Sequence, residues 1–104
     1  MFTVISLSPF SVAAKGDFFM ENTGEKRIAV ISIIVENKNS TERINSLLHD
    51  YGEYIVGRIG IPYREKNISV LAVVIDAEPS VINSLTGKLG MAEGVSAKSL
   101  FSKF

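Results

Sequence analysis

The sequence predicts an α+β fold whose elements follow the order strand, helix, strand, strand, helix, strand. Three observations support this prediction. Two apolar runs of about eight residues are rich in β-branched side chains, which is typical of buried strands. Two other segments carry apolar residues three and four positions apart, as expected for a helix with one buried face. Clusters of turn-forming residues separate these segments.

The length of 104 residues is that of one domain. We place this domain at residues 27–104 and an N-terminal arm at residues 1–26. Residues 1–19 are expected to be flexible or to be the product of an upstream start codon. Another possibility is an extra strand that pairs with an edge of the sheet and is formed by Phe2, Val4 and Ile5.

The composition excludes several classes of function. Eleven basic residues balance eleven acidic ones, so no net charge attracts the chain to nucleic acid or to an anionic membrane. The chain has no cysteine, which excludes disulfides, thiolate metal sites and cysteine nucleophiles. Its apolar runs are far shorter than the roughly 20 residues of a membrane-spanning helix. The first residues match a secretory signal poorly, because no basic residue precedes them and Pro9 interrupts them. We therefore expect a cytoplasmic protein without a cofactor.

The first predicted strand, residues 28–35, reads "IAVISIIV" and is too short for an isolated buried helix. The polar stretch "ENKNSTE" then turns the chain. Within it, Asn39 is followed three residues later by Glu42, which is the form of a capping box at the start of a helix. Competing caps are Ser40 and Thr41. The helix should end at Gly52, and its buried stripe consists of Ile44, Leu47, Leu48 and Tyr51.

The second predicted strand, residues 54–63, reads "YIVGRIGIPY". Gly57 and Gly60 should permit a β-bulge or a close approach of another backbone segment. Pro62 cannot donate a hydrogen bond to a neighbouring strand, so this strand is a candidate for an edge of the sheet. The polar turn "REKN" joins it in a hairpin to the third strand, residues 68–76.

The second predicted helix begins near Pro79, a residue that the first turn of a helix tolerates. Its apolar face consists of Val81, Ile82, Leu85 and Leu89, and Gly87 weakens its last turn. Residues 95–101 form the last strand. This βαββαβ order is that of the ferredoxin-like fold, with both helices on one face of a four-stranded antiparallel sheet. Right-handed crossovers place the first and third strands in the centre.

Both faces of the two central strands are apolar, although a sheet covered by helices on one side only should alternate apolar and polar residues. In the first strand, Ile28, Val30 and Ile34 share one face, while Ala29, Ile31, Ile33 and Val35 share the other. An uncovered patch of this kind approaches the size that soluble monomers tolerate. We therefore expect self-association into a dimer or tetramer through the sheet face or the edges. Coverage of the face by the N-terminal arm is the alternative.

Polar residues near the ends of the first two strands form a candidate ligand site. They are Glu36, Asn37, Asn39, Arg58, Tyr63 and Arg64. An arginine together with amides at a helix N-terminus can hold a carboxylate, which suggests a small anion or an amino acid at a subunit boundary. Loop solvation and surface ion pairs are the alternative interpretation.

The chain offers little for metal binding or catalysis. His49 is its one histidine and is expected on the exposed face of the first helix. One histidine without cysteine does not make a zinc or nickel site within a subunit, and no serine or threonine has an identifiable base partner. We therefore expect no metal site and no catalytic residue.

The segments "IVGRIGIPYRE" and "LTGKLGMAEGV" carry a resemblance that extends over residues 27–99. This stretch is similar to the iron-only hydrogenase system regulators, small proteins of ACT-like, ferredoxin-like fold. It also resembles the C-terminal effector domain of nickel-responsive repressors, whose several histidines and cysteine it lacks. The 26 residues before Arg27 are too few for the DNA-binding domain of such repressors.

The resemblance implies a regulatory, non-enzymatic, oligomeric ACT-like module that binds a small effector or a partner protein in hydrogenase maturation or regulation. It implies no direct contact with nucleic acid and none with a membrane. Two alternatives remain open. One is a structural subunit without a ligand. The other is a small acylphosphatase-like enzyme in which Arg58 holds an anion while Asn37 or Asn39 orients water.

Overall fold

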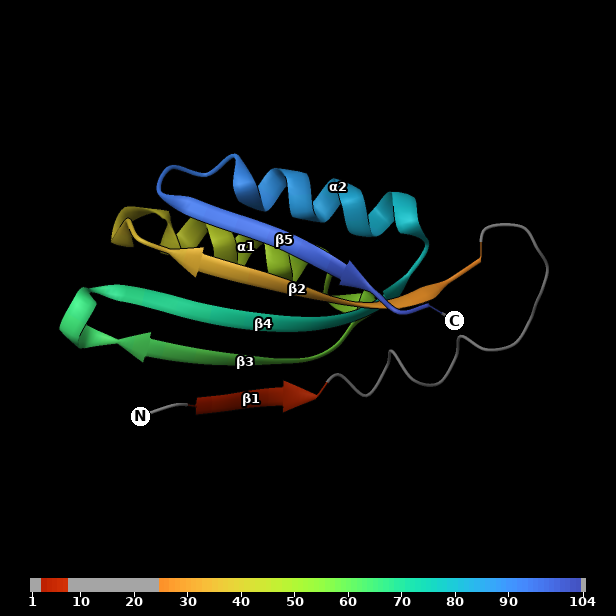
Figure 1. Cartoon of the computed structure of the whole chain (residues 1–104), viewed down its shortest axis with the longest axis horizontal. Coiled ribbons are helices and arrows are strands. Elements are labelled where there is room, and N and C mark those ends of the chain that lie inside the picture. Colours follow the sequence, from red (N-terminus) through yellow and green to blue (C-terminus); the bar gives the residue numbers. More distant parts are fainter. Residues whose placement is uncertain (1–2, 8–24, 104) are drawn as a thin grey trace.

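The computed structural model of the chain describes residues 3–7 and 25–103 (Figure 1). Seven helices and strands make up the described part, and 3-10 turns at Lys38–Ser40, Gly52–Tyr54 and Arg64–Lys66 connect several of them. In chain order, these elements are β1 Thr3–Leu7, β2 Arg27–Val35, α1 Thr41–Asp50, β3 Ile55–Tyr63, β4 Ile68–Ala77, α2 Pro79–Gly90 and β5 Val95–Phe101.

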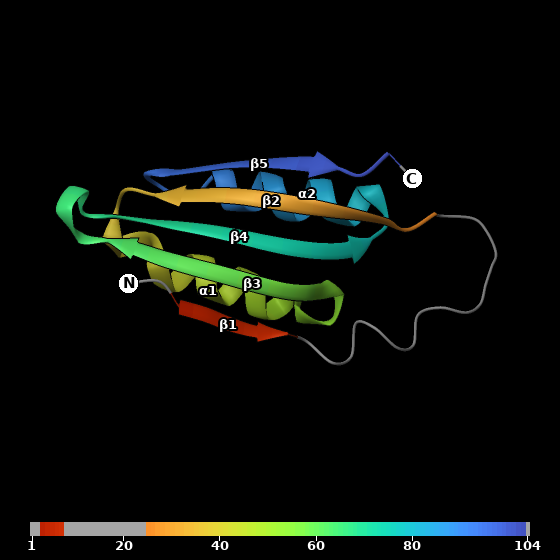
Figure 2. The same ribbon diagram turned by 60° about the horizontal axis from the view of Figure 1, so that its bottom comes forward.

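The strands form one antiparallel sheet in the order β1-β3-β4-β2-β5. Both helices lie on the same face of this sheet, and the other face carries no helix of the described residues (Figure 2). The prediction of a ferredoxin-like βαββαβ arrangement is confirmed. Among the four predicted strands, β2 and β4 are central, as the right-handed crossovers required.

Strand β1 adds a fifth strand to this arrangement. It pairs with residues 57–60 of β3, so the prediction that β3 is an edge of the sheet is wrong along this stretch. Pro62 lies beyond the stretch that β1 covers, so the missing N–H of proline breaks no pairing with β1 there. Val4 and Ile5 lie within β1, whereas Phe2 and residues 8–24 lie outside the described residues.

A β-bulge interrupts the pairing of β3 with β4, as its glycines led us to expect. Ile55 pairs with Ile75, but Gly57 rather than Val56 pairs with the next residue, Val74. Because of this extra residue, the side chains of β3 after the bulge point to the opposite faces of the sheet from those that regular alternation would give.

The start of α1 differs from the prediction. Asn39 lies inside the preceding 3-10 turn, and the residue whose side chain caps this turn is Asn37, whose Oδ1 accepts a hydrogen bond from the Asn39 N–H over 2.9 Å. Ser40 is the residue before α1, but its hydroxyl makes no capping bond. The predicted capping box at Asn39 and Glu42 is therefore wrong, because Asn39 lies in a turn of 3-10 helix and the N-cap position of α1 falls one residue later, at Ser40. Pro79 occupies the first turn of α2, as predicted.

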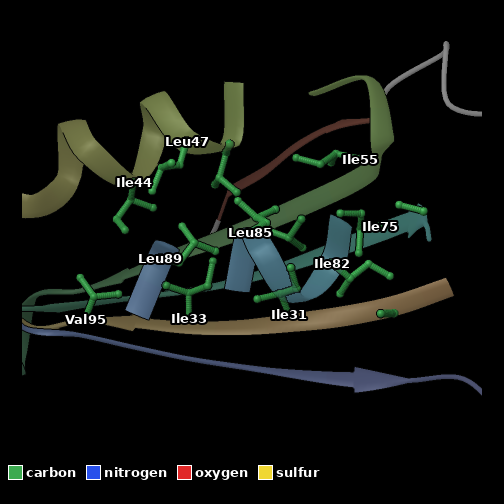
Figure 3. Close-up of a cluster of buried hydrophobic side chains, with 14 of the residues drawn as sticks. Ile31, Ile33, Ile44, Leu47, Ile55, Ile75, Ile82, Leu85, Leu89 and Val95 are labelled. Atoms are coloured by element: carbon green, nitrogen blue, oxygen red, sulfur yellow. The ribbon is translucent and has the colours of Figure 1, made fainter. Parts of the chain in front are cut away.

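The core fills the space between the two helices and the sheet (Figure 3). The predicted apolar stripes of the helices contribute to it, and so do alternate residues of β2 and β4. The fully buried large side chains are those of Ile31, Ile33, Ile44, Leu48, Val73, Ile75, Ile82, Leu85 and Leu89. Tyr51 and Val81 are partly buried against this core.

The side of the sheet opposite the helices, which we name the open face, is also apolar. This was predicted from the two central strands, which carry apolar residues on both faces. Its larger exposed side chains, with 39% to 73% of their surface accessible, are Ile28, Ile34, Ile59, Ile61, Tyr63 and Leu100. Partly buried between them are Val30, Ile68, Val70, Ala72 and Val74. None of the helices in residues 25–103 is long and apolar enough to cross a membrane.

Candidate ligand site

Two surface hollows adjoin near the end of the sheet where β3 turns into β4. The first, the Arg58 hollow, has a volume of about 460 Å³ and is lined by Val35, Thr41, Ile44, Asn45, Arg58, Gly60, Ile61, Pro62, Ser69 and Leu71. The second, the Arg64 hollow, has a volume of about 470 Å³ and is lined by Lys38, Pro62, Tyr63, Arg64, Asn67, Ile68 and Ser69. Pro62 and Ser69 line both hollows and lie opposite each other in the β3–β4 pair.

The bulge in β3 places Arg58 in the first hollow. Ile55 and Arg58 pair with Ile75 and Val73, two buried residues of β4 that face the helices. Residues three positions apart share a face of a strand only when a bulge lies between them. The Arg58 guanidinium consequently lies on the helix side of the sheet, where its Nη2 donates a hydrogen bond to Asn45 Oδ1 of α1 over 3.2 Å.

The walls of the Arg58 hollow are largely apolar. Val35 and Ile44 are buried core residues, and Leu71 is packed against the core. The space beside Gly60 is open, because a Cβ added there would meet only Leu71 Cδ2, at 4.0 Å. The polar groups are few: the hydroxyls of Thr41 and Ser69, the Asn45 amide and the guanidinium. Such a lining of apolar walls with a few polar groups is typical of small-molecule sites.

The charges of both hollows have one sign. Arg58 lines the first, whereas Lys38 and Arg64 line the second. Among the described residues, no aspartate or glutamate lines either hollow. Since arginine binds carboxylates and phosphates through paired N–H groups, the lining favours an anionic ligand over a cation.

Three of the six predicted site residues line the two hollows: Arg58 lies in the first, and Tyr63 and Arg64 lie in the second. Tyr63 donates a hydrogen bond to Glu65 Oε1 over 3.1 Å. The other three, Glu36, Asn37 and Asn39, line neither hollow.

Glu36 and Asn37 lie instead beside the loop between α2 and β5. The Glu36 N–H donates to the Gly94 carbonyl over 2.7 Å. Gly94 has a φ of +72°, and a Cβ on it would lie 2.6 Å from Asn37 Cβ. Ser40 adds a third contact by donating from Oγ to the Glu93 carbonyl over 2.6 Å. This part of the loop therefore holds the β2–α1 and α2–β5 connections together.

Several lining residues were not predicted from the sequence, among them Thr41, Asn45 and Ser69. Thr41 belongs to the polar stretch after β2, so its position offered a signal. Asn45 and Ser69 offered none, because their place in the hollow depends on how α1 and β4 pack beside β3.

A separate polar cluster joins α1 to α2. The Tyr51 hydroxyl lies 3.2 Å from Ser84 Oγ and accepts a hydrogen bond from Lys88 Nζ over 3.0 Å. The hydrogen bonds to Ser84 and Lys88 lower the pKa of Tyr51 from 10.0. Burial raises the pKa of the neighbouring Tyr54. We assign this cluster to the packing of the helices.

His49 is exposed on α1, as predicted. In residues 25–103, no group of three histidine, cysteine, aspartate or glutamate side chains is placed to hold a metal ion.

Comparisons with known proteins agree on one group. The TM1266-like family model, described as "Iron-only hydrogenase system regulator, putative", matches residues 27–99. The solved structure of the uncharacterized protein TM1266 from Thermotoga maritima is similar to this chain, with 35% sequence identity and a TM-score of 0.73. The match covers 76% of this chain and 100% of that chain. No curated protein matches the sequence.

Proposed function

The chain belongs to the TM1266-like family of iron-only hydrogenase system regulators, and on this premise we propose that it is a non-enzymatic cytoplasmic regulator that binds a small organic anion. The Arg58 hollow is the observation that carries this proposal. It combines a guanidinium fixed by Asn45 with apolar walls, and its volume of about 460 Å³ suits a small molecule.

The lining supports a carboxylate with a short aliphatic body as the effector. The guanidinium would pair with the carboxylate, and the side chains of Ile44, Pro62 and Leu71 would contact the aliphatic part. An amino acid fits less well, because its ammonium group would find no aspartate or glutamate in the lining.

The same lining supports binding over catalysis. In the part of the chain that the structure describes, no aspartate, glutamate, histidine or cysteine side chain lines either hollow to transfer a proton or attack a substrate near neutral pH. The amides considered for an acylphosphatase-like reaction, Asn37 and Asn39, lie outside both hollows. Asn45 does lie beside Arg58, but its Oδ1 already accepts the guanidinium hydrogen bond.

Thermal unfolding in the presence of sodium isovalerate, a branched carboxylate, tests the proposal. At roughly one hundred times its Kd, a ligand stabilises the folded state by about 2.7 kcal/mol, which raises the Tm of a domain of this size by roughly 10–20 °C. We expect this rise with isovalerate and a smaller one with leucine. The Arg58→Gln variant should lose the rise.

The matched control is Arg43→Gln, which removes the same charge from an exposed position of α1 outside the hollow. This variant should keep the rise in Tm. The proposal is wrong if isovalerate leaves the Tm unchanged, if Arg58→Gln responds like the unmodified chain, or if the protein hydrolyses acetyl phosphate with turnover.

A further inference from the structure

The open face has the composition of a protein interface. The sheet register aligns Leu100, Val30 and Val74 across three strands, and it aligns Ile34, Val70 and Ile61 in a second row. The row between them holds Lys98, Ser32, Ala72 and Ile59. Among the described side chains of β2 to β5 on this face, two are charged: Lys98, on the outermost strand, and Asp76, toward the end of β4. An apolar centre with charges at the rim is the usual anatomy of an interface.

We propose that a second copy of this chain covers the open face, with the two sheets packed against each other. The face is large enough for such a contact. Its four strands β2 to β5 have seven to ten residues each. With roughly 3.4 Å per residue and 4.8 Å between strands, the backbone of these strands spans a flat area on the order of 600 Å². The side chains that protrude from the sheet add to the accessible surface. Stable interfaces bury about 600–1,000 Å² per partner, so this face reaches the lower end of that range.

Edge pairing does not achieve the same coverage. Strand β1 already pairs with β3, and no strand of the described residues pairs with the outer edge of β5. A copy added beside β5 would extend the sheet but would leave Ile34, Val70 and Ile61 exposed to water. Only a layer on top of the sheet removes these side chains from solvent.

The chemistry of the face also favours an identical partner. A two-fold contact brings the same surface of both copies together, so that surface must be complementary to itself. An apolar face with its two charged side chains at the rim meets this condition, because stacking brings no like charges together at its centre. A binding site for a polar or charged partner would need complementary charges that the centre of this face lacks.

The molar mass of the full chain in solution, measured by light scattering after gel filtration, tests this inference. Interfaces of this size have affinities from roughly micromolar to picomolar, so a concentration of about 50 μM is suitable. The expected mass is twice the 11.3 kDa of one chain. The Ile34→Lys variant should elute as a single chain with an unchanged circular dichroism spectrum, since Ile34 is 39% exposed in one copy.

Met91→Lys is the matched control, because Met91 is an exposed apolar residue after α2, away from the open face. This variant should keep the dimer mass. If Ile34→Lys does not fold, the double variant Ile34→Thr, Leu100→Thr retains β-propensity at Ile34 and should raise the dissociation constant at least tenfold. A single-chain mass for the unmodified protein, whatever else covers the face, overturns the inference. An unchanged dissociation constant in the double variant does so too. Neither result depends on ligand binding at Arg58.

Discussion

Arg58 Nη2 donates a hydrogen bond to Asn45 Oδ1 over 3.2 Å and thereby joins the bulged strand β3 to the middle of α1. The bond fixes the guanidinium at the wall of the hollow before any ligand arrives. It uses one of the five N–H donors of the arginine. A site whose charged group is held in place loses less conformational entropy when it binds.

The first prediction concerns this contact. Asn45→Ala should leave Arg58 present but mobile, and it should weaken isovalerate binding by about threefold to tenfold, equivalent to roughly 0.5–1.5 kcal/mol for one hydrogen bond. Titration calorimetry measures the affinity. Asn83→Ala on the exposed side of α2 is the control and should bind isovalerate as the unmodified chain does. Equal affinities for both variants would show that Asn45 does not position the arginine.

The second prediction concerns Gly94. Its φ of +72° disfavours any side chain, and a Cβ would lie 2.6 Å from Asn37 Cβ and 3.1 Å from the Asn37 nitrogen. Gly94→Ala should therefore lower the free energy of unfolding by about 1–3 kcal/mol, as measured by urea denaturation. Gly90→Ala, at the end of α2 with nothing within 4 Å, should be neutral or slightly stabilising. The assignment of this close contact fails if both variants unfold alike.

The third prediction concerns Ser40, the one buried polar side chain among those described. Its Oγ donates to the Glu93 carbonyl over 2.6 Å and connects two loops that are 53 residues apart in sequence. Ser40→Ala should cost about 1–3 kcal/mol of unfolding free energy, because the carbonyl loses its side-chain partner in a partly buried place. Ser46→Ala, at an exposed position of α1, should change stability by less than about 0.5 kcal/mol. A Ser40→Ala variant as stable as Ser46→Ala would contradict the role of this bond.

The fourth prediction concerns two tyrosines. Hydrogen bonds to Ser84 and Lys88 lower the pKa of Tyr51, whereas burial raises that of Tyr54. In an ultraviolet titration, Tyr51 should ionise at a lower pH than Tyr54, and Tyr51→Phe should remove the earlier step. The stability that ionised Tyr51 contributes is fully present above the unfolded pKa of about 10 and is lost as the pH falls through the lowered folded value. The reverse order of ionisation would contradict the assigned contacts.

The order of elements and the two helical stripes were predictable because they depend on periodicity within short segments. Ile44, Leu47 and Leu48 repeat with the helical period, and all three are buried. The apolar open face was predictable for a similar reason, since residues of a strand point alternately to its two sides. The start of α1 was not predictable from its capping pattern, because Asn37 and Asn39 form a 3-10 turn that competes with the capping box.

The candidate site was less predictable than the fold. Arg58 was singled out for its charge, but the face on which it lies depends on the bulge beside Gly57, and glycine indicates a bulge without giving its place. Its partner Asn45 lies 13 residues away on another element. Glu36, Asn37 and Asn39 were grouped with Arg58 as polar residues that follow the first predicted strand or lie on the second one. The structure places them instead beside Gly94 or in their own turn. There the Glu36 N–H donates to the Gly94 carbonyl, and the Asn39 N–H donates to Asn37 Oδ1.

The most direct test of the central claim is an amide chemical-shift titration of the full chain with sodium isovalerate. The account predicts saturable shifts confined to the surroundings of the Arg58 hollow, with the largest at Ile44, Gly60 and Leu71. It also predicts their loss in Arg58→Gln and their persistence in Arg64→Gln, which alters only the neighbouring hollow. Shifts that never saturate, that centre on residues outside this hollow, or that survive in Arg58→Gln would contradict the claim that this chain binds a small carboxylate there.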